Sequence, residues 1–355
     1  MDFRSAVNWG VIGCGQIALD KSLPGLLAAP SARLIAISDP LESRRALALE
    51  LAGQHGETPQ AYEEYDSLLS NPDVDAVYIA LPTGMHVEAV KAATNAGKAI
   101  LCEKPLGRSA EETRIMIRAA RNANVPLMAA YMSRFSDVFQ EGARLLREGT
   151  IGQVTSVVAH FSYFALYKIG APGGWRWIEA EGGGPLLDIG VYLAFGLREM
   201  LGEPIVKVRA MECNTVAPDG ATINDTLTAW FQTESGIPGS FITAFSHNEC
   251  RISVYGTKGS LQVKHLFGQG PEGHLECHAE NFHHVLDQYK TELPHYENYR
   301  REIEHFSSSL LGHTAYHPSP EEVLSDALLL DALRDSSQNN DVVNIPSANE
   351  YLESQ

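Results

Sequence analysis

Near its N-terminus the chain carries the stretch VNWGVIGCGQIA, residues 7–18. Its first six residues are mostly apolar and fit a short buried β-strand. The six that follow match G-x-G-x-x-A, a pattern that binds dinucleotide phosphates where a strand turns into a helix. Gly13 allows a tight turn, Gly15 lets the backbone approach a pyrophosphate, and Ala18 permits close helix–strand packing. The stretch therefore predicts the opening strand, loop and helix of a Rossmann domain.

Short apolar runs and helix-length segments alternate through the first part of the chain. Such alternation predicts a parallel sheet covered by helices on both faces. Pro24 interrupts the first helical stretch, so we expect a break or a new first turn there. Strands are expected at residues 7–12, 33–38, 75–81, 98–102 and 125–130, and helices at 41–52, 86–96 and 110–122.

After about residue 130 the pattern becomes that of a mostly antiparallel sheet with one open face. The length of 355 residues fits two domains at about 150 residues each. We therefore expect an α/β protein with a doubly wound Rossmann domain at 1–129 and a C-terminal α/β domain at 130–355. Strands of the second domain are expected at 152–164, 221–245, 250–255 and 260–263, and helices at 185–201, 296–311 and 319–336, the last opened by a capping box of Ser319 and Glu322.

Composition narrows the classes of partner. The chain has 27 basic and 44 acidic residues, a net charge of −17, which argues against nucleic acid and anionic membranes. There is no apolar run of 18 residues and no signal-peptide pattern at the start, so a cytoplasmic protein is expected. The five scattered cysteines fit free thiols in a reducing compartment. A neutral small molecule is the expected partner.

Ligands of parallel α/β sheets bind beyond the carboxyl ends of the strands. Asp39 ends the second strand about 20 residues after the glycine motif, where an acid accepts hydrogen bonds from the adenine ribose hydroxyls. Its charge would repel a 2′-phosphate, so we expect NAD, with NADP as the alternative. Arg44 and Arg45 follow closely, but they fit an ordinary exposed helix face. The other strand ends place residues 82–86, 103–105 and 131–134 at the same edge.

Two further motifs carry groups for proton transfer. Lys104 follows the strand at 98–102, and its ammonium could polarise a hydroxyl or carbonyl group. The stretch GGGPLLDIGVY (182–192) feeds three glycines into a helix on which Asp188 and Tyr192, four residues apart, share a face. A carboxylate and a phenol on an apolar helix need partners if they are buried. On spacing alone, an exposed surface pair is an equal alternative.

Taken in order, these motifs resemble one family. The glycine motif, Asp39, LPTGMH (81–86), EKP (103–105) and the GGG…DIGVY helix are similar in order and spacing to the glucose–fructose oxidoreductase / inositol dehydrogenase / rhizopine-catabolism (Gfo/Idh/MocA) family. The resemblance extends over nearly the whole chain. Tyrosine at position 192, where many inositol-type members have histidine, is similar to the branch of dihydrodiol and aldose dehydrogenases.

The resemblance implies an NAD(P)-dependent oxidoreductase that moves a hydride between nicotinamide and a carbinol or carbonyl carbon of a sugar, polyol or related cyclic alcohol. It implies Lys104 and Tyr192 as acid/base groups, with Asp188 orienting them. The ammonium of Lys104 and the oxidised nicotinamide together are expected to lower the pKa of Tyr192 from about 10 toward working pH. The expected cofactor-binding residues are Gly13, Gly15, Gln16, Ile17, Asp39, Leu81, Pro82, Thr83, His86, Glu103, Lys104 and Arg176.

Two other functions stay open: a regulatory protein that binds a dinucleotide without turnover, and an enzyme on glycosides that recycles its NAD internally. The presence of Lys104, Asp188 and Tyr192 together favours an enzyme. The His-rich stretch 274–295 resembles an inserted loop at the substrate pocket or a subunit contact, and its H-x-x-C-H order fits no closed zinc template, so no metal is expected. The open sheet face predicts a homodimer or homotetramer.

Overall fold

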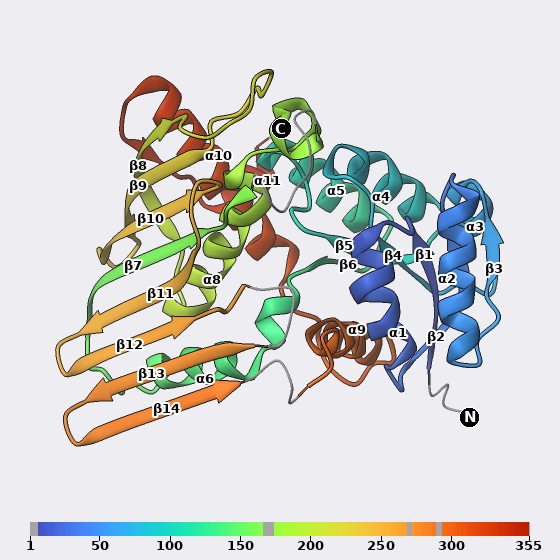
Figure 1. Ribbon diagram of the computed structural model, residues 1–355, viewed down its shortest axis with the longest axis horizontal. Helices are drawn as coiled ribbons and strands as arrows, with labels where there is room; N and C mark the ends of the chain where they lie inside the picture. The colour runs from blue at the N-terminus through green and yellow to red at the C-terminus, as the bar shows by residue number, and fades with distance from the viewer. Residues whose placement is uncertain (1–5, 166–173, 268–271, 289–292, 355) are drawn as a thin grey trace.

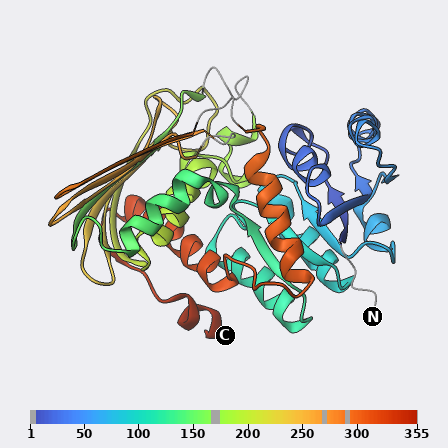
Figure 2. The ribbon, with the colours of Figure 1, turned by 90° about the horizontal axis from the view of Figure 1, so that it is seen from below.

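The computed structural model describes residues 6–165, 174–267, 272–288 and 293–354. Two sheets lie side by side, with helices on both faces of the first and between the two (Figures 1 and 2). This is the expected α/β architecture. In the part of the chain that is described, no helix is both long and apolar enough to cross a bilayer.

The first sheet has six strands in the order β3-β2-β1-β4-β5-β6, and all of its pairs are parallel. The order reverses between β1 and β4, and dinucleotides bind at such a switch point. The short strand β3 was not predicted. The strands are β1 (Val7–Ile12), β2 (Ala32–Ser38), β3 (Gln60–Tyr62), β4 (Ala76–Ile79), β5 (Ala99–Glu103) and β6 (Leu127–Ala130).

The helix after the glycine motif changes its hydrogen bonding at Pro24. After Gln16 and Ile17 it has a π-helical turn, η1 (Ala18–Ser22), and α1 (Leu23–Leu27) follows with Pro24 in its first turn. Proline lacks the N–H that a continuing helix needs, so the predicted new first turn is confirmed. The other helical elements around this sheet are α2 (Glu42–Gln54), α3 (Tyr65–Leu69), η2 (Thr83–Met85), α4 (His86–Asn95) and α5 (Ala110–Asn122).

The second sheet has nine strands in the order β14-β13-β12-β11-β7-β10-β9-β8-β15. Its pairs are antiparallel except that of β7 with β10. The expected strand segment 221–245 is divided into two strands, and β8 was not predicted. The strands are β7 (Val154–Ser162), β8 (Ile205–Cys213), β9 (Thr226–Thr233), β10 (Pro238–Ala244), β11 (Glu249–Gly256), β12 (Gly259–Lys264), β13 (Gly273–Ala279), β14 (Phe282–Gln288) and β15 (Val343–Asn344).

The His-rich segment is not an inserted loop, so that interpretation was wrong. Its described part forms the hairpin β13–β14 at the edge of the sheet, while residues 289–292 lie outside the described residues. Leu275 and Cys277 are buried, whereas the alternate residues His274, Glu276 and His278 are polar and more exposed. The strand alternation is present, but histidines on both strands mask it in the sequence.

One face of the second sheet is covered by helices and the other is open (Figure 2). The predicted capping box of Ser319 and Glu322 opens α10. The helix α9 returns to the first domain, where Trp9 Nε1 donates to Ser307 Oγ at 3.1 Å. The boundary between residues 129 and 130 stays a prediction. The helical elements here are η3 (Met132–Phe135), α6 (Asp137–Arg147), η4 (Trp175–Trp177), η5 (Glu179–Glu181), η6 (Leu186–Gly190), α8 (Val191–Leu201), α9 (Glu297–Leu310), α10 (Pro320–Asn339) and α11 (Ala348–Glu353).

Candidate active site

The glycine motif forms an open turn at the end of β1. Gly13 has φ +92°, and a Cβ atom there would lie 2.6 Å from the carbonyl oxygen of Ala80. A Cβ at Gly15 would have no neighbour within 4 Å. Gly13 is therefore required by the fold, whereas Gly15 leaves its backbone open to a ligand. Gln16 and Ile17 start the helix that follows. This arrangement fits the pyrophosphate of a dinucleotide.

Asp39 lies beside this turn and is 3% exposed. Its carboxylate accepts hydrogen bonds from the backbone N–H groups of Cys14 and Leu41, each at 2.9 Å. Arg44 is exposed on α2, as expected, but its guanidinium also lies 3.7 Å from the Asp39 carboxylate. Arg45 donates to the Asp39 carbonyl at 2.7 Å. Both an acid and a cation therefore stand at the predicted ribose site.

His86 holds two strand-end loops together. It is 1% exposed, with Nε2 2.9 Å from the Leu81 carbonyl and Nδ1 3.1 and 3.0 Å from the carbonyls of Pro105 and Leu106. Burial lowers the pKa of His86, and the three carbonyls offset this only in part. Through these three carbonyls His86 connects the loop after β4 with the loop after β5. Cofactor contact by His86 and by Leu81, Pro82 and Thr83 stays a prediction.

Lys104 reaches from the end of β5 to the second domain. Its Nζ donates to the Asp188 carbonyl at 3.0 Å and lies 4.0 Å from the Asp188 carboxylate. The same nitrogen lies 4.5 Å from the centre of the Tyr192 ring. Burial lowers the pKa of Lys104, but Tyr192, Asp188 and Glu103 raise it more, so the net shift is upward. The ammonium form is therefore favoured.

Asp188 is the centre of a buried polar cluster. It lies in the π-helical turn η6, where its Oδ2 accepts from Tyr163 at 2.7 Å and from Arg176 Nε at 3.0 Å. Burial raises the pKa of Asp188, but the charges of Arg176 and Lys104 lower it by a larger amount. The net shift is downward, so the carboxylate is ionised. With 7% exposure, the surface-pair alternative is wrong. Sequence analysis missed Tyr163, whose one signal was its place near the end of an expected strand.

Tyr192 is 6% exposed and packs against Phe161 and Phe267, with ring centres 5.6 and 5.5 Å away. Its hydroxyl lies 3.9 Å from the sulfur of Met132. Burial raises the pKa of Tyr192, and Lys104 lowers it by less. Lys104 by itself therefore does not bring about the expected lowering, because the loss of hydration outweighs the ammonium charge, and the joint effect with an oxidised nicotinamide stays a prediction.

Beneath Lys104, Glu103 is buried and accepts from the Tyr78 hydroxyl at 2.8 Å and from the Lys104 backbone N–H at 3.2 Å. Arg176 lies over the Trp175 ring at 4.3 Å, and Trp177 is buried in the core. The structure thus brings Lys104, at the end of β5, together with Arg176, Asp188 and Tyr192 of the second domain, and it adds Tyr163.

Comparison with known proteins identifies the class. Residues 7–131 match the oxidoreductase family with an NAD-binding Rossmann fold, and residues 139–262 match the Gfo/Idh/MocA C-terminal domain. The chain is an NAD(P)-dependent oxidoreductase. It belongs to the Gfo/Idh/MocA family, as the sequence motifs predicted.

Among its relatives, mouse trans-1,2-dihydrobenzene-1,2-diol dehydrogenase is 34% identical over 74% of this chain and 76% of its own length. D-xylose 1-dehydrogenase (NADP(+)) 2 of Haloferax volcanii is 28% identical over 95% and 99%. The crystal structure of an aldose-aldose oxidoreductase from Caulobacter crescentus with glycerol has a TM-score of 0.85 at 26% identity, covering 96% of this chain and 100% of that one.

Proposed function

We propose that this protein transfers a hydride between a nicotinamide dinucleotide and a carbinol or carbonyl carbon of a sugar, polyol or related cyclic alcohol. Lys104 and Tyr192 are the proton-transfer groups. The observation that carries the proposal is the approach of the Lys104 ammonium, from the Rossmann domain, to within 4.5 Å of the Tyr192 ring centre in the second domain. Two domains thus supply one acid/base pair.

The residues at the strand ends suit the cofactor. Gly13, Gly15, Gln16 and Ile17 would hold the pyrophosphate and Asp39 the adenine ribose. We propose NAD as the preferred form, because the buried Asp39 carboxylate disfavours a 2′-phosphate. When bound, the nicotinamide donates or accepts the hydride. The residues expected to line its nicotinamide half are Leu81, Pro82, Thr83, Glu103, Lys104 and Arg176.

The protonation states define the roles of the pair. The Tyr192 phenol is neutral at pH 7, so it can donate a proton to a carbonyl oxygen during reduction. The Lys104 ammonium stabilises the phenolate that this leaves and the alkoxide developing on the substrate. In oxidation the phenolate takes the proton back. Asp188 keeps Lys104 and Arg176 in place through contacts at 3.0 Å with each.

The names of the relatives support the substrate class. They describe enzymes of a cyclic diol, of xylose and of aldoses, all compounds with neighbouring hydroxyl groups. A 3-ketoreductase from Actinomadura kijaniata, 26% identical, has also been solved as a lysine-to-alanine variant and a tyrosine-to-phenylalanine variant. These are the two residue types proposed here for proton transfer.

A panel of polyols, aldoses and cyclic diols, with NAD and with NADP, tests the proposal through absorbance of the reduced cofactor. We expect saturable formation of NADH with at least one class of polyol. The name of the aldose-aldose oxidoreductase favours a second candidate, in which the cofactor is recycled between two sugars. That candidate predicts paired sugar products without NADH release. No turnover by either readout contradicts the proposed enzyme and leaves a dinucleotide-binding regulator.

A further inference from the structure

The hairpin β13–β14 forms one edge of the second sheet. Its strands are joined by a two-residue turn, Glu280–Asn281, in which Asn281 adopts the left-handed conformation (φ 62°). The turn sets the register so that His278 and His283 are directly opposite each other. Cross-strand partners have Cβ atoms about 5 Å apart on one face of a sheet. The two imidazoles are therefore held close by the backbone.

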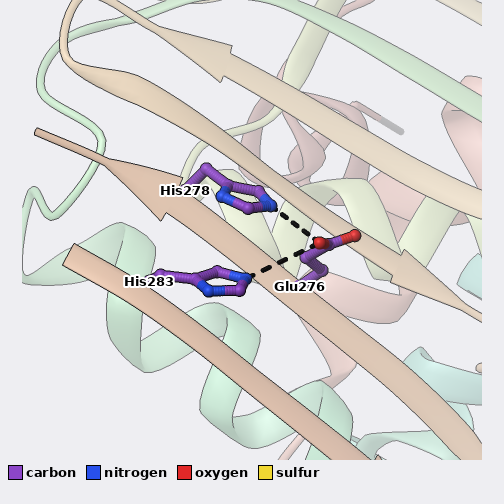
Figure 3. Close-up of side chains that lie close together, drawn as sticks. All are labelled: Glu276, His278 and His283. Carbon is purple, nitrogen blue, oxygen red and sulfur yellow. Dashed lines mark hydrogen bonds and ion pairs between the residues drawn. The ribbon is translucent and has the colours of Figure 1, made fainter.

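A carboxylate completes the group. Glu276 lies two residues before His278, so its side chain is on the same face of β13. Its Oε1 is 2.7 Å from His278 Nε2 and 3.7 Å from His283 Nε2. Figure 3 shows both rings, one from each strand, aimed at this carboxylate. One nitrogen from each ring and one carboxylate oxygen all lie within 4.8 Å of one another.

The surroundings favour a cation from solvent. Both imidazole side chains are 57% exposed. The partners of this row on β12 are Ser260, opposite His278, and Gln262, opposite Glu276, and both are neutral. The other His–acid group, Glu199, His317 and Glu322, differs because the Arg198 guanidinium lies 3.1 Å from both of its carboxylates. That cluster is already neutralised by an arginine.

We propose that Glu276, His278 and His283 form a binding site for a divalent transition metal ion, with Zn²⁺ as the best match. Two imidazoles and one carboxylate are a common zinc ligand set, and they leave further coordination positions to water. The linear H-x-x-C-H order is misleading here, because Cys277 points into the core on the opposite face. Metal bound across the hairpin would hold its two edge strands together. The site is separate from the proposed hydride chemistry.

Calorimetric titration of the untagged, chelator-treated full-length protein with Zn²⁺ tests this. We expect one saturable site per chain, and binding weakened at least about tenfold in His278→Gln, His283→Gln and Glu276→Gln. His55→Gln is the matched control, an exposed histidine at the end of α2, and should bind as the wild type does. Zn²⁺ should raise the Tm of the wild type more than that of His283→Gln, because a ligand of the folded state stabilises it.

Cobalt gives an independent readout, since Co²⁺ on these ligands should show visible absorption that the three variants lose. Circular dichroism of each variant checks that it is folded. Binding should also weaken in acid, because protons compete for the imidazole nitrogens. The proposal is overturned if the wild type shows no saturable binding, or if His278→Gln and His283→Gln keep wild-type affinity.

Discussion

At the scale of single residues, burial and charge compete at Tyr192 and Lys104. Burial raises the pKa of the phenol, and the ammonium does not fully offset it. The same ammonium is favoured by its anionic surroundings. The Tyr192 phenol and the Lys104 ammonium therefore both carry a proton at neutral pH, which suits proton donation to a substrate carbonyl. Oxidation of an alcohol requires the phenol to lose its proton first.

Replacement of Tyr192 by phenylalanine removes the proposed proton carrier and keeps the packed ring. We expect kcat to fall by roughly 10²-fold or more, the usual loss for general acid/base catalysis. Nucleotide affinity, measured by fluorescence titration, should change little. Lys104→Met should lower kcat similarly. Tyr163→Phe is a matched control, which removes a hydrogen bond to Asp188 but leaves Tyr192 and Lys104 in place, and it should have a smaller effect. Near-normal kcat in both Tyr192→Phe and Lys104→Met would exclude this mechanism.

The direction of the Tyr192 pKa shift predicts opposite pH profiles for the two directions of reaction. Because the pKa lies above its ordinary value of about 10, the phenol is protonated at neutral pH. Carbonyl reduction should stay constant through neutral pH and fall as alkali removes the proton, whereas alcohol oxidation should rise with pH. Initial rates in both directions test this. An oxidation rate that is flat from pH 7 to 10 would contradict the assignment.

Asp39 and Arg44 should act in opposite senses on cofactor choice. Asp39→Ala removes the carboxylate that disfavours a 2′-phosphate, so the kcat/KM preference for NAD over NADP should narrow. Arg44→Ala removes the cation 3.7 Å from that carboxylate, and should weaken NADP more than NAD. Steady-state kinetics with both cofactors give the ratios. A wild-type protein that already prefers NADP would show that the argument from Asp39 is wrong.

At the scale of elements, Arg198 on α8 fastens that helix to α10. Its guanidinium contacts Asp326 at 2.8 Å and Glu322 at 3.1 Å, and its side chain is 11% exposed. Burial would raise the pKa of Glu199, but the hydrogen bond from His317 and the charge of Arg198 lower it to about 2. An acid with a lowered pKa stabilises the fold above its unfolded pKa of about 4.3, and this stabilisation is lost as the pH falls toward 2.

Arg198→Met should therefore destabilise the protein by about 3–5 kcal/mol near neutral pH, because buried carboxylates lose their partner. The difference from wild type should shrink as the pH falls, first near 6, because burial raises the pKa of Asp326 to about 6, and then toward 2, where Glu199 becomes protonated. Urea unfolding at several pH values measures both effects. Arg147→Met, an exposed arginine at the end of α6, should change the free energy of unfolding by less than about 0.5 kcal/mol. Equal effects of the two substitutions would exclude the proposed fastening role.

An element could be predicted from the sequence where its own residues carry the pattern of a strand or a helix. It could not be predicted where its structure depends on contacts with distant residues. Apart from β3, the strands of the first sheet are short, mostly apolar runs, so 7–12 and β1 coincide. The hairpin β13–β14 was missed because histidines occupy both strands. Tyr163 was missed because its partner Asp188 lies on a distant helix, and no local pattern records that contact. The raised pKa of Tyr192 likewise depends on burial by distant aromatic rings.

At the scale of the whole molecule, the proposed active site and the proposed metal site lie in different parts of the structure. The proposed active site lies where the domains meet, through the contact of Lys104 with Asp188. The outer face of the second sheet carries large exposed apolar side chains at the β8–β9 end, with Met211 66% and Trp230 43% exposed. The proposed metal site is on the hairpin at the other end of the strand order. Exposed apolar side chains also lie beside the proposed metal site, where Val285, 42% exposed, is the cross-strand partner of Glu276.

Apolar side chains clustered on an open sheet face favour burial against another copy, because each would otherwise remain in contact with water. Val342 extends the group beside β15, so the exposed apolar residues span the end of the sheet from β9 to β15. We expect light scattering at micromolar concentration to show a dimer or tetramer. Trp230→Glu should shift the protein to a smaller species, because it places a charge in the contact. Leu47→Glu adds the same charge at an exposed leucine on α2, 52% exposed, and should keep the wild-type mass. A monomeric wild type, or an unchanged mass in Trp230→Glu, would count against association through this face.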